Sequence, residues 1–306
     1  MNLLLVVNPT ASAVRDRQRV QVEDVLAAEH HLIVAVTEGR GHATELAREA
    51  VASGVEVVVA MGGDGTFNET ANGLVGSTTA LATIPAGSTN VYCRTIGFTN
   101  DPVEAAREVV AALRSGSRRR VEMGRANDRY YLFHLGVGFD AEVVERVEAM
   151  GNIKRRLGQG AFVYAAVASW VAHPQRGDPW FSVRFDDGSV HEGSLALCLK
   201  TNPYTFLGKR PLDVAPETGF GTPLAVAVVH DLRLATIGKA FRSTLGGGRD
   251  LDRQPGVTVR TSVESVTITA SRPFPHQVDG DYLGQVDSLE VSYERSCLDL
   301  VVPRGS

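Results

Sequence analysis

The strongest constraint on the fold is a β-favouring run, Val55–Ala60, that leads directly into the glycine-rich segment Met61–Leu74, MGGDGTFNETANGL. A nearly unbroken apolar run is typical of a strand that is buried on both faces, as in a parallel sheet. The glycines predict a tight turn, and FNETANGL favours a helix. A strand, a glycine-rich turn and a helix in this order present backbone N–H groups to a phosphate. Asp64 stands in this turn, although a carboxylate repels a bare phosphate.

The segments on either side continue the alternation of strand and helix. Strands are predicted at residues 2–8, 31–38, 55–61 and 79–87, and helices at residues 14–28, 42–53, 67–74 and 101–113. Four strands that alternate with helices predict an open parallel sheet with flanking helices and right-handed crossovers. The fold class expected for this part of the chain is therefore α/β.

The character of the sequence changes at the segment Arg114–Arg120, RSGSRRR. Downstream, short β-favouring runs are separated by turn signals such as Asp187-Gly188 and Asp279-Gly280. This pattern predicts a mainly antiparallel β-sandwich, interrupted by helices at about 141–150 and 154–172. A chain of 306 residues also favours two domains. The expected domains are 1–117 (α/β), 118–295 (β-sandwich) and a C-terminal strand within 296–306 that returns to the first domain.

Composition and charge narrow the class of protein. A net charge of −4 argues against a nucleic-acid-binding protein. Three scattered cysteines fit a reducing cytoplasm better than a disulfide framework. The opening residues predict a strand and not a signal peptide, and the apolar run 161–172 is shorter than the roughly 20 residues of a membrane span. We expect a cytoplasmic protein with peripheral contact on the inner face of the membrane.

Two basic segments bear on membrane contact. Arg118–Arg120 is interpreted as a solvated linker in preference to a contact for acidic lipid or phosphate. Lys154, Arg155 and Arg156 precede the apolar run 161–172, and this segment fits a membrane interface and a packed core helix equally well.

Four small, polar loops follow the four predicted strands. They are Asn8–Ser12, the segment from Thr37, the segment from Gly62 to Glu69, and Pro85–Asn90. The carboxyl ends of parallel strands share one edge of a sheet, where ligands bind. The chain carries neither a P-loop motif nor a GxGxxG dinucleotide motif, so these loops predict a different kind of phosphate site.

These motifs resemble those of a known family. NPTAS, MGGDGTFNETANGL, IPAGSTNVYCRTIG, GVGFDAEVVE and VDGDYLG stand in the order found in diacylglycerol-kinase-type lipid kinases, a family that includes bacterial lipid kinases and sphingosine kinases. The resemblance spans residues 2 to about 302. It implies a lipid kinase that uses ATP and Mg²⁺, with ATP between an N-terminal α/β domain and a C-terminal β-sandwich, and with a lipid alcohol as substrate.

The resemblance also implies which residues surround the nucleotide. They are Asn8, Pro9, Thr10, Ala11, Ser12, Thr37, Gly62, Gly63, Asp64, Gly65, Thr66, Asn68, Glu69, Ser88 and Asn90. The glycines let the backbone approach phosphates, and the hydroxyls of Thr66 and Ser88 are donors. Asp64 fits this loop if Mg²⁺ lies between its carboxylate and the phosphates. Asp64 is thus the expected metal ligand and one of two catalytic residues.

The second expected catalytic residue is Asp281 in VDGDYLG. In the family, a DGE motif ends in the acid that deprotonates the acceptor hydroxyl, and Asp281 takes that place with one methylene fewer. The competing interpretation is that residues 279–281 form only a hairpin turn. Asp140, in GVGFDAEVVE, is expected to cap the helix that follows it.

Two other functions keep the same fold. A kinase for NAD or another soluble alcohol shares the GGDGT motif, whereas GFDAEVVE and VDGDYLG favour the lipid branch. A nucleotide-binding regulator without turnover is the third hypothesis, supported by the shorter acid at position 281 and by Val91, where relatives carry an acid. The identity of the lipid and a homodimeric assembly are left open.

Overall fold

The computed structural model describes residues 1–11, 16–150, 160–172 and 177–304. Within these ranges the chain forms two compact units. Unit 1 comprises Met1–Met123 together with Arg295–Ser306, and unit 2 comprises Gly124–Glu294.

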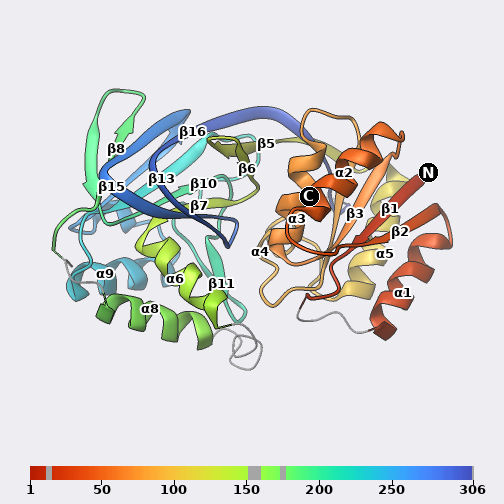
Figure 1. The fold of residues 1–306 in the computed structure, drawn as a ribbon, viewed down its shortest axis with the longest axis horizontal. Coiled ribbons are helices and arrows are strands. Elements are labelled where there is room, and N and C mark those ends of the chain that lie inside the picture. The colour runs from red at the N-terminus through yellow and green to blue at the C-terminus, as the bar shows by residue number, and fades with distance from the viewer. Residues whose placement is uncertain (12–15, 151–159, 173–176, 305–306) are drawn as a thin grey trace. The chain divides into compact units, whose positions relative to one another are not determined.

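Unit 1 is built on a parallel sheet whose first four strands lie in the order β4, β3, β1, β2 (Figure 1). Their bounds are β1 Asn2–Val7, β2 His31–Val36, β3 Val57–Gly62 and β4 Ala80–Pro85. All residues of β3 and β4 are buried, which explains why their sequences are apolar without alternation. The C-terminal part of β16 (Asp281–Val301) pairs in parallel with β4. The predicted parallel sheet is confirmed.

Helices flank this sheet. They are α1 Asp16–Ala27, α2 His42–Ala52, α3 Asp64–Leu74, α4 Val91–Thr95 and α5 Pro102–Ser115. Helix α1 packs with α5, and α2 packs with α3. Right-handed crossovers in this strand order place the two pairs on opposite faces of the sheet, as Figure 1 shows.

Unit 2 is a mainly antiparallel sheet structure with the strand order β14, β13, β10, β7, β15, β16. The strands before β16 are β5 Arg118–Ala126, β6 Arg129–Tyr131, β7 His134–Gly138, β8 Phe181–Phe185, β9 Val190–Gly193, β10 Leu195–Leu199, β11 Thr205–Leu207, β12 Arg210–Leu212, β13 Leu224–Val229, β14 Val257–Val263 and β15 Ser265–Val278. A core that includes Tyr131, Phe181 and Phe274 joins the strands. The predicted antiparallel, strand-rich part is confirmed.

The described helices of unit 2 are α6 Phe139–Ala149, α8 Gly160–Ala172, α9 Leu234–Leu245 and the short 3₁₀ helix η1 Leu251–Arg253. Helix α6 packs against α8 and β15. Across the described ranges, no helix has both the length and the apolar composition to cross a membrane. The expected helical start at Lys154–Arg156 and its basic residues lie outside the described residues.

Three local expectations differ from the structure. Helix α3 begins at Asp64, three residues earlier than predicted, because Gly63 in an extended conformation is its N-cap. The C-terminal strand is no separate element but the end of β16. Residues 118–120 are not a solvated linker, since they begin β5.

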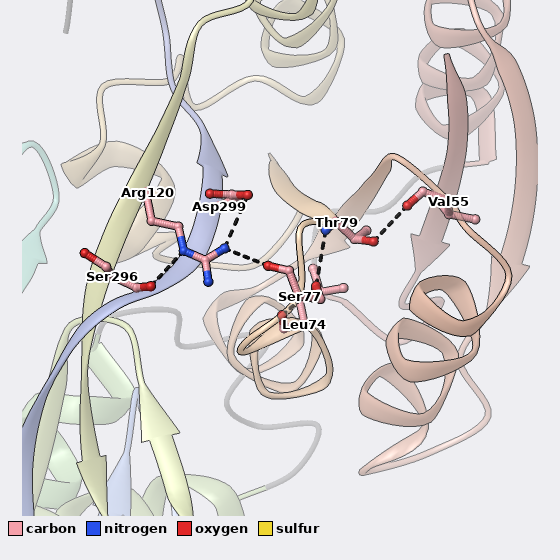
Figure 2. A network of polar contacts seen from close by, with 7 residues as sticks. All are labelled: Val55, Leu74, Ser77, Thr79, Arg120, Ser296 and Asp299. Carbon is pink, nitrogen blue, oxygen red and sulfur yellow. Dashed lines mark hydrogen bonds and ion pairs between the residues drawn. The ribbon is translucent and has the colours of Figure 1, made fainter.

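Arg120 shows why this last segment is ordered. Its guanidinium donates hydrogen bonds to the carbonyls of Ser77, at 2.6 Å, and Ser296, at 2.7 Å, and it pairs with Asp299 at 3.3 Å (Figure 2). Ser77 in turn holds the end of α3, because its hydroxyl donates to the Leu74 carbonyl at 2.8 Å. Arg120 therefore joins β5, β16 and the turn after α3 within unit 1.

Candidate active site

The loop that follows β3, Gly62–Glu69, contacts each of the other three predicted loops. The connection to the loop after β1 is a side-chain contact. Asn8 donates from Nδ2 to the Thr66 hydroxyl at 3.0 Å, and its Oδ1 accepts the Thr10 N–H at 3.0 Å. Gly62 is required beside this contact, because a Cβ there would lie 2.4 Å from the Thr66 hydroxyl oxygen.

The loops after β3 and β4 touch through two glycines. A Cβ on Gly87 would lie 2.7 Å from the Cα of Gly63, so Gly87 has no room for a larger residue without displacement of backbone, whereas a Cβ on Gly63 would be in ordinary contact, 3.4 Å from the Cα of Gly87. Next to this contact, the Asp64 carboxylate accepts the N–H groups of Val91 and Tyr92, each at 2.9 Å. Asp64 thus caps α4, whose own N-cap residue makes no side-chain capping bond.

Glu69 makes the corresponding connection to the loop after β2. Its carboxylate accepts the N–H of Gly41 at 2.8 Å and that of Ala43 at 3.3 Å, at the start of α2. The N-cap of this helix is Gly41, which has no side chain to cap it. The two acids of GGDGTFNE therefore hold the N-termini of the two neighbouring helices.

The other predicted nucleotide residues differ in exposure. Asn68 is buried within α3, and Asn90 is buried with its amide bonded to the Gly87 backbone and to Asn100. Pro9, Thr10 and Ser88 are exposed, Gly63 and Gly65 are half-buried, and Thr37 is buried where β2 ends. Ser12 lies outside the described residues. Direct contact of each of these residues with a nucleotide stays a prediction.

Asp64 fits a metal only together with phosphates. The described part of the chain holds no group of three or more His, Cys, Asp or Glu side chains that suits a metal ion. Mg²⁺ is usually held by one or two carboxylates and the phosphates of a nucleotide. The donor set is therefore compatible with Mg²⁺ that binds with ATP, and this role of Asp64 stays a prediction.

The second predicted motif, VDGD, lies in unit 2, at the turn between β15 and β16. Asp279 is buried in the left-handed region, with φ at 49°, and its carboxylate accepts three backbone N–H groups: Leu132 at 2.7 Å, Phe133 at 3.0 Å and His134 at 3.0 Å. Asp281 is half-buried at the first position of β16. The first acid of the motif is thus structural, and the second is placed by it.

A buried polar network lies against this turn. Gln277 is fully buried; its Oε1 accepts the Gly280 N–H at 2.8 Å, and its Nε2 donates to Asp140 at 2.7 Å. Tyr204 donates its hydroxyl to the other Asp140 oxygen. Burial raises the pKa of the Asp140 carboxyl, although these two hydrogen bonds oppose the rise. Gln277 therefore connects Asp140 to the peptide that precedes Asp281.

The predicted capping role of Asp140 is wrong. Asp140 is the second residue of α6, the N-cap is Gly138, and no side chain makes the capping bond. The carboxylate points instead to Tyr204 and Gln277, and it lies so close to β7 that a Cβ on Gly136 would be 1.7 Å from its Oδ2. Sequence reasoning missed Tyr204 and Gln277. Gln277 has a signal, since it stands two residues before DGD, whereas nothing in the sequence marks Tyr204.

An apolar pocket of about 180 Å³ opens beside this network in unit 2. Its walls come from β10, β13 and α9, with Asp140 and Tyr204 among a mostly aliphatic lining. Among the described residues, the helix that contributes most to this lining is α9, through Ile237, Ala240, Phe241 and Thr244. An apolar cavity with a few polar groups at its wall suits an amphiphilic ligand.

The fold, with its glycine-rich loops in unit 1 and its antiparallel unit 2, is similar to that of lipid kinases of the diacylglycerol kinase type. Residues 2–126 match the diacylglycerol kinase catalytic domain. The predicted resemblance to this family and the predicted enzyme class are confirmed.

Relatives extend the similarity over the chain. A "probable lipid kinase YegS-like" protein of Chromohalobacter salexigens is 37% identical over 59% of this chain, and the match spans 57% of that protein's own length. A diacylglycerol kinase of Bacillus subtilis is 26% identical over 86% of this chain and 83% of its own. A crystal structure described as a diacylglycerol kinase from Bacillus anthracis str. Sterne has the same fold, with a TM-score of 0.72, 20% identity, and coverage of 99% of this chain and 97% of that one.

Proposed function

We propose that the protein is an ATP- and Mg²⁺-dependent kinase that phosphorylates a hydroxyl of diacylglycerol or a related lipid. The observation that carries this proposal is the way in which Gly62–Glu69 is bonded to the loops after β1, β2 and β4 within unit 1. This arrangement fixes a glycine-rich backbone at the carboxyl edge of a parallel sheet, where phosphates bind.

The loop residues hold the phosphates of ATP. Gly63 and Gly65 are half-buried and carry no side chain, so their backbone N–H groups can approach phosphate oxygens closely. Asp64 would hold Mg²⁺ together with the phosphates of ATP. Mg²⁺ bound with ATP supplies neutralisation of the charge on the β- and γ-phosphates.

Asp281 is the base in this proposal. Its carboxylate accepts the proton of the acceptor hydroxyl, and the alkoxide oxygen forms the new bond to the γ-phosphorus as the bond to ADP breaks. Asp279 and Gln277 hold the backbone on the N-terminal side of Asp281 through four hydrogen bonds to N–H groups. A base on a rigid turn keeps its position during the transfer.

The apolar pocket of unit 2 supports a lipid acceptor. Its aliphatic lining excludes water from an acyl chain, and Asp140 and Tyr204 are placed to bind a polar group of the same molecule. A soluble alcohol such as NAD has no acyl chain that could fill an aliphatic pocket of this kind.

The test is phosphoryl transfer from labelled ATP to a panel of lipid alcohols, namely diacylglycerol, monoacylglycerol and a sphingoid base, with NAD as the soluble acceptor. We expect transfer to a lipid that requires Mg²⁺. Asp281→Asn should lower kcat by about 10²- to 10⁴-fold, as is typical for loss of a general base. Asp287→Asn is the matched control, because Asp287 is an exposed acid on the same strand.

Three outcomes contradict the proposal. Full activity of Asp64→Ala or of Asp281→Asn removes the assignment of the site. Transfer to NAD in the absence of lipid identifies a soluble-alcohol kinase. Tight ATP binding without transfer to any acceptor identifies a regulator.

A further inference from the structure

Helix α9 exposes a row of large apolar side chains. Leu234 is 67% exposed and Phe241 is 49% exposed, and Ile237 is half-buried between them. The spacing of three and four residues puts all three on one face of the helix. The buried residues Thr236 and Ser243 define the opposite face, which packs onto unit 2. Large apolar residues grouped on one exposed helix face are typical of an interaction site.

This exposed row is continuous with the pocket. Ile237 and Phe241 both line the cavity that also contains Asp140 and Tyr204. Because Phe241 contacts solvent and the cavity at once, it lies at the opening. An apolar path therefore leads from the surface of α9 to the interior of unit 2.

The charges of α9 have one sign. Residues 233–245 include Arg233, Lys239 and Arg242 and no acid. The nearby acids are used within the protein: Asp231 accepts hydrogen bonds from Thr236 and the Arg233 N–H, and Asp250 accepts one from Ser243. Arg233 and Arg242 flank the apolar row, and basic residues in such a position complement anionic headgroups above acyl chains.

Helix α8 adds a second apolar row close by. Tyr164, Val167 and Val171 are 60%, 58% and 62% exposed, and their spacing also puts them on one face. The Trp170 indole N–H donates to the Leu232 carbonyl at 2.7 Å, so the end of α8 lies next to the start of α9 (Figure 1). The described residues of α8 carry no charge.

We propose that the exposed face of α9, formed by Leu234, Ile237 and Phe241 and flanked by Arg233 and Arg242, docks onto the surface of an anionic phospholipid bilayer. The apolar row enters the headgroup region, the basic residues pair with lipid phosphates, and the pocket opens toward the acyl chains. This inference deepens the proposed function, because it names the surface from which the lipid substrate enters.

The test is co-sedimentation of the full chain, without ATP, with vesicles of phosphatidylcholine alone and vesicles of an equal mixture of phosphatidylcholine and phosphatidylglycerol. We expect binding to the anionic vesicles that weakens with added salt. Leu234→Glu should lower the partition coefficient by about tenfold or more, since it removes a buried apolar group and adds a repelled charge. Arg242→Gln should lower it by about fivefold.

Val20→Glu is the matched control, because Val20 is an exposed apolar residue on helix α1 of unit 1, with 53% exposure. It should leave vesicle binding unchanged. Equal loss of binding in Val20→Glu, unchanged binding in Leu234→Glu, or equal binding to neutral and anionic vesicles would overturn the proposal. So would a wild-type dimer that Leu234→Glu converts to a monomer, since the face would then contact a second copy.

A separate assay keeps this inference distinct from the proposed function. Transfer to a short-chain diacylglycerol dissolved below its aggregation threshold does not need a bilayer. Leu234→Glu should keep this activity and lose activity on vesicle-embedded substrate. Loss of both activities in a folded variant would place Leu234 in the substrate site and contradict a docking role, whereas inactivity of the wild type in both assays contradicts the proposed function alone.

Discussion

Asp279 in unit 2 and Asp64 in unit 1 both bind backbone N–H groups, but their surroundings differ. Asp279 is buried and holds three N–H groups of one segment, residues 132–134. Asp64 is half-buried and holds two N–H groups at the start of α4. An anion in a dry site has no water to replace a lost partner, whereas one in an open loop can exchange partners with solvent or with a ligand.

The two units therefore divide structural and functional roles between their acids in different ways. In unit 2 the structural task falls to Asp279, and Asp281, the next acid, is half-buried and is the expected base. In unit 1 the same residue, Asp64, caps a helix and is the expected metal ligand. The side chains of a glycine-rich motif of this kind thus also hold the neighbouring loops together. The position of an acid in the motif does not by itself show that it binds a metal.

The largest expected effect is on Asp279. Asp279→Ala leaves three buried N–H groups without an acceptor, and each such group costs about 1–3 kcal/mol. We expect the free energy of unfolding to fall by more than about 3 kcal/mol, measured by urea denaturation. Asp281→Ala should leave stability almost unchanged and abolish transfer. Similar stability losses in both variants would remove the distinction between the two acids.

Acid sensitivity tests whether the region around Asp279 is dry. Burial lowers the pKa of His134 from 6.5 to about 3, and its Nδ1 has no hydrogen-bond partner among the described residues. Below about pH 6.5 the unfolded chain binds a proton that the folded unit excludes, so the free energy of unfolding falls by up to about 1.4 kcal/mol per pH unit down to about pH 3.

His134→Phe should remove this part of the pH dependence in urea titrations at a series of pH values. His31→Phe is the control, because His31 is exposed on the edge strand β2. An unchanged pH slope in His134→Phe means that water reaches the ring.

Helix capping in unit 1 should give a smaller effect. Glu69→Gln keeps one acceptor oxygen but loses the charge and one of two bonds to the start of α2, a change of about 0.5–2 kcal/mol. Circular dichroism during thermal unfolding measures it. Asp64→Asn should cost a similar amount of stability while it also lowers Mg²⁺-dependent transfer. An equal loss of phosphoryl transfer in Glu69→Gln and Asp64→Asn would contradict a separate metal-binding role of Asp64. Both acids would then act only by fixing the loop Gly62–Glu69 to α2 and α4.

The smallest effect on stability is expected at Arg120 in unit 1. Arg120→Met removes contacts with Ser77, Ser296 and Asp299 at a partly exposed site, so we expect a loss of about 1 kcal/mol and unchanged ATP affinity. Arg118→Met, two positions earlier on the same strand and exposed, is the control and should have almost no effect in urea denaturation. A change in ATP affinity in Arg120→Met would show that this network reaches the loops.

The sequence predicted elements where one physical signal dominates. Strands β3 and β4 are apolar on both faces, and Asp101 before Pro102 marks the start of α5, where the Asp101 carboxylate accepts two N–H groups at 3.0 Å. The start of α3 was misplaced because Gly65 disfavours a helix, while the contacts of Asp64 and Asn8 that stabilise this turn are far apart in the sequence.

The candidate site was predictable as a set of loops, and its internal bonding was not. The sequence motifs place Asp64 and Asp281 in their loops. They do not predict which backbone N–H groups a carboxylate binds. Asp140 illustrates this limit: its position before a helix favours capping, yet Tyr204 and Gln277, 64 and 137 residues away, bind its oxygens. Arg120 likewise depends on partners 43 and 176 residues distant.

Strand β16 has a consequence for how the protein is made. Its last part, which pairs with β4 through Leu300 and Leu81, follows all of unit 2 in the sequence. The ribosome therefore synthesises the whole of unit 2 before it makes the strand that covers β4. Until then the nascent α/β unit presents a mostly apolar edge strand, which is a template for aggregation. The first unit to be translated is thus the last to complete its sheet.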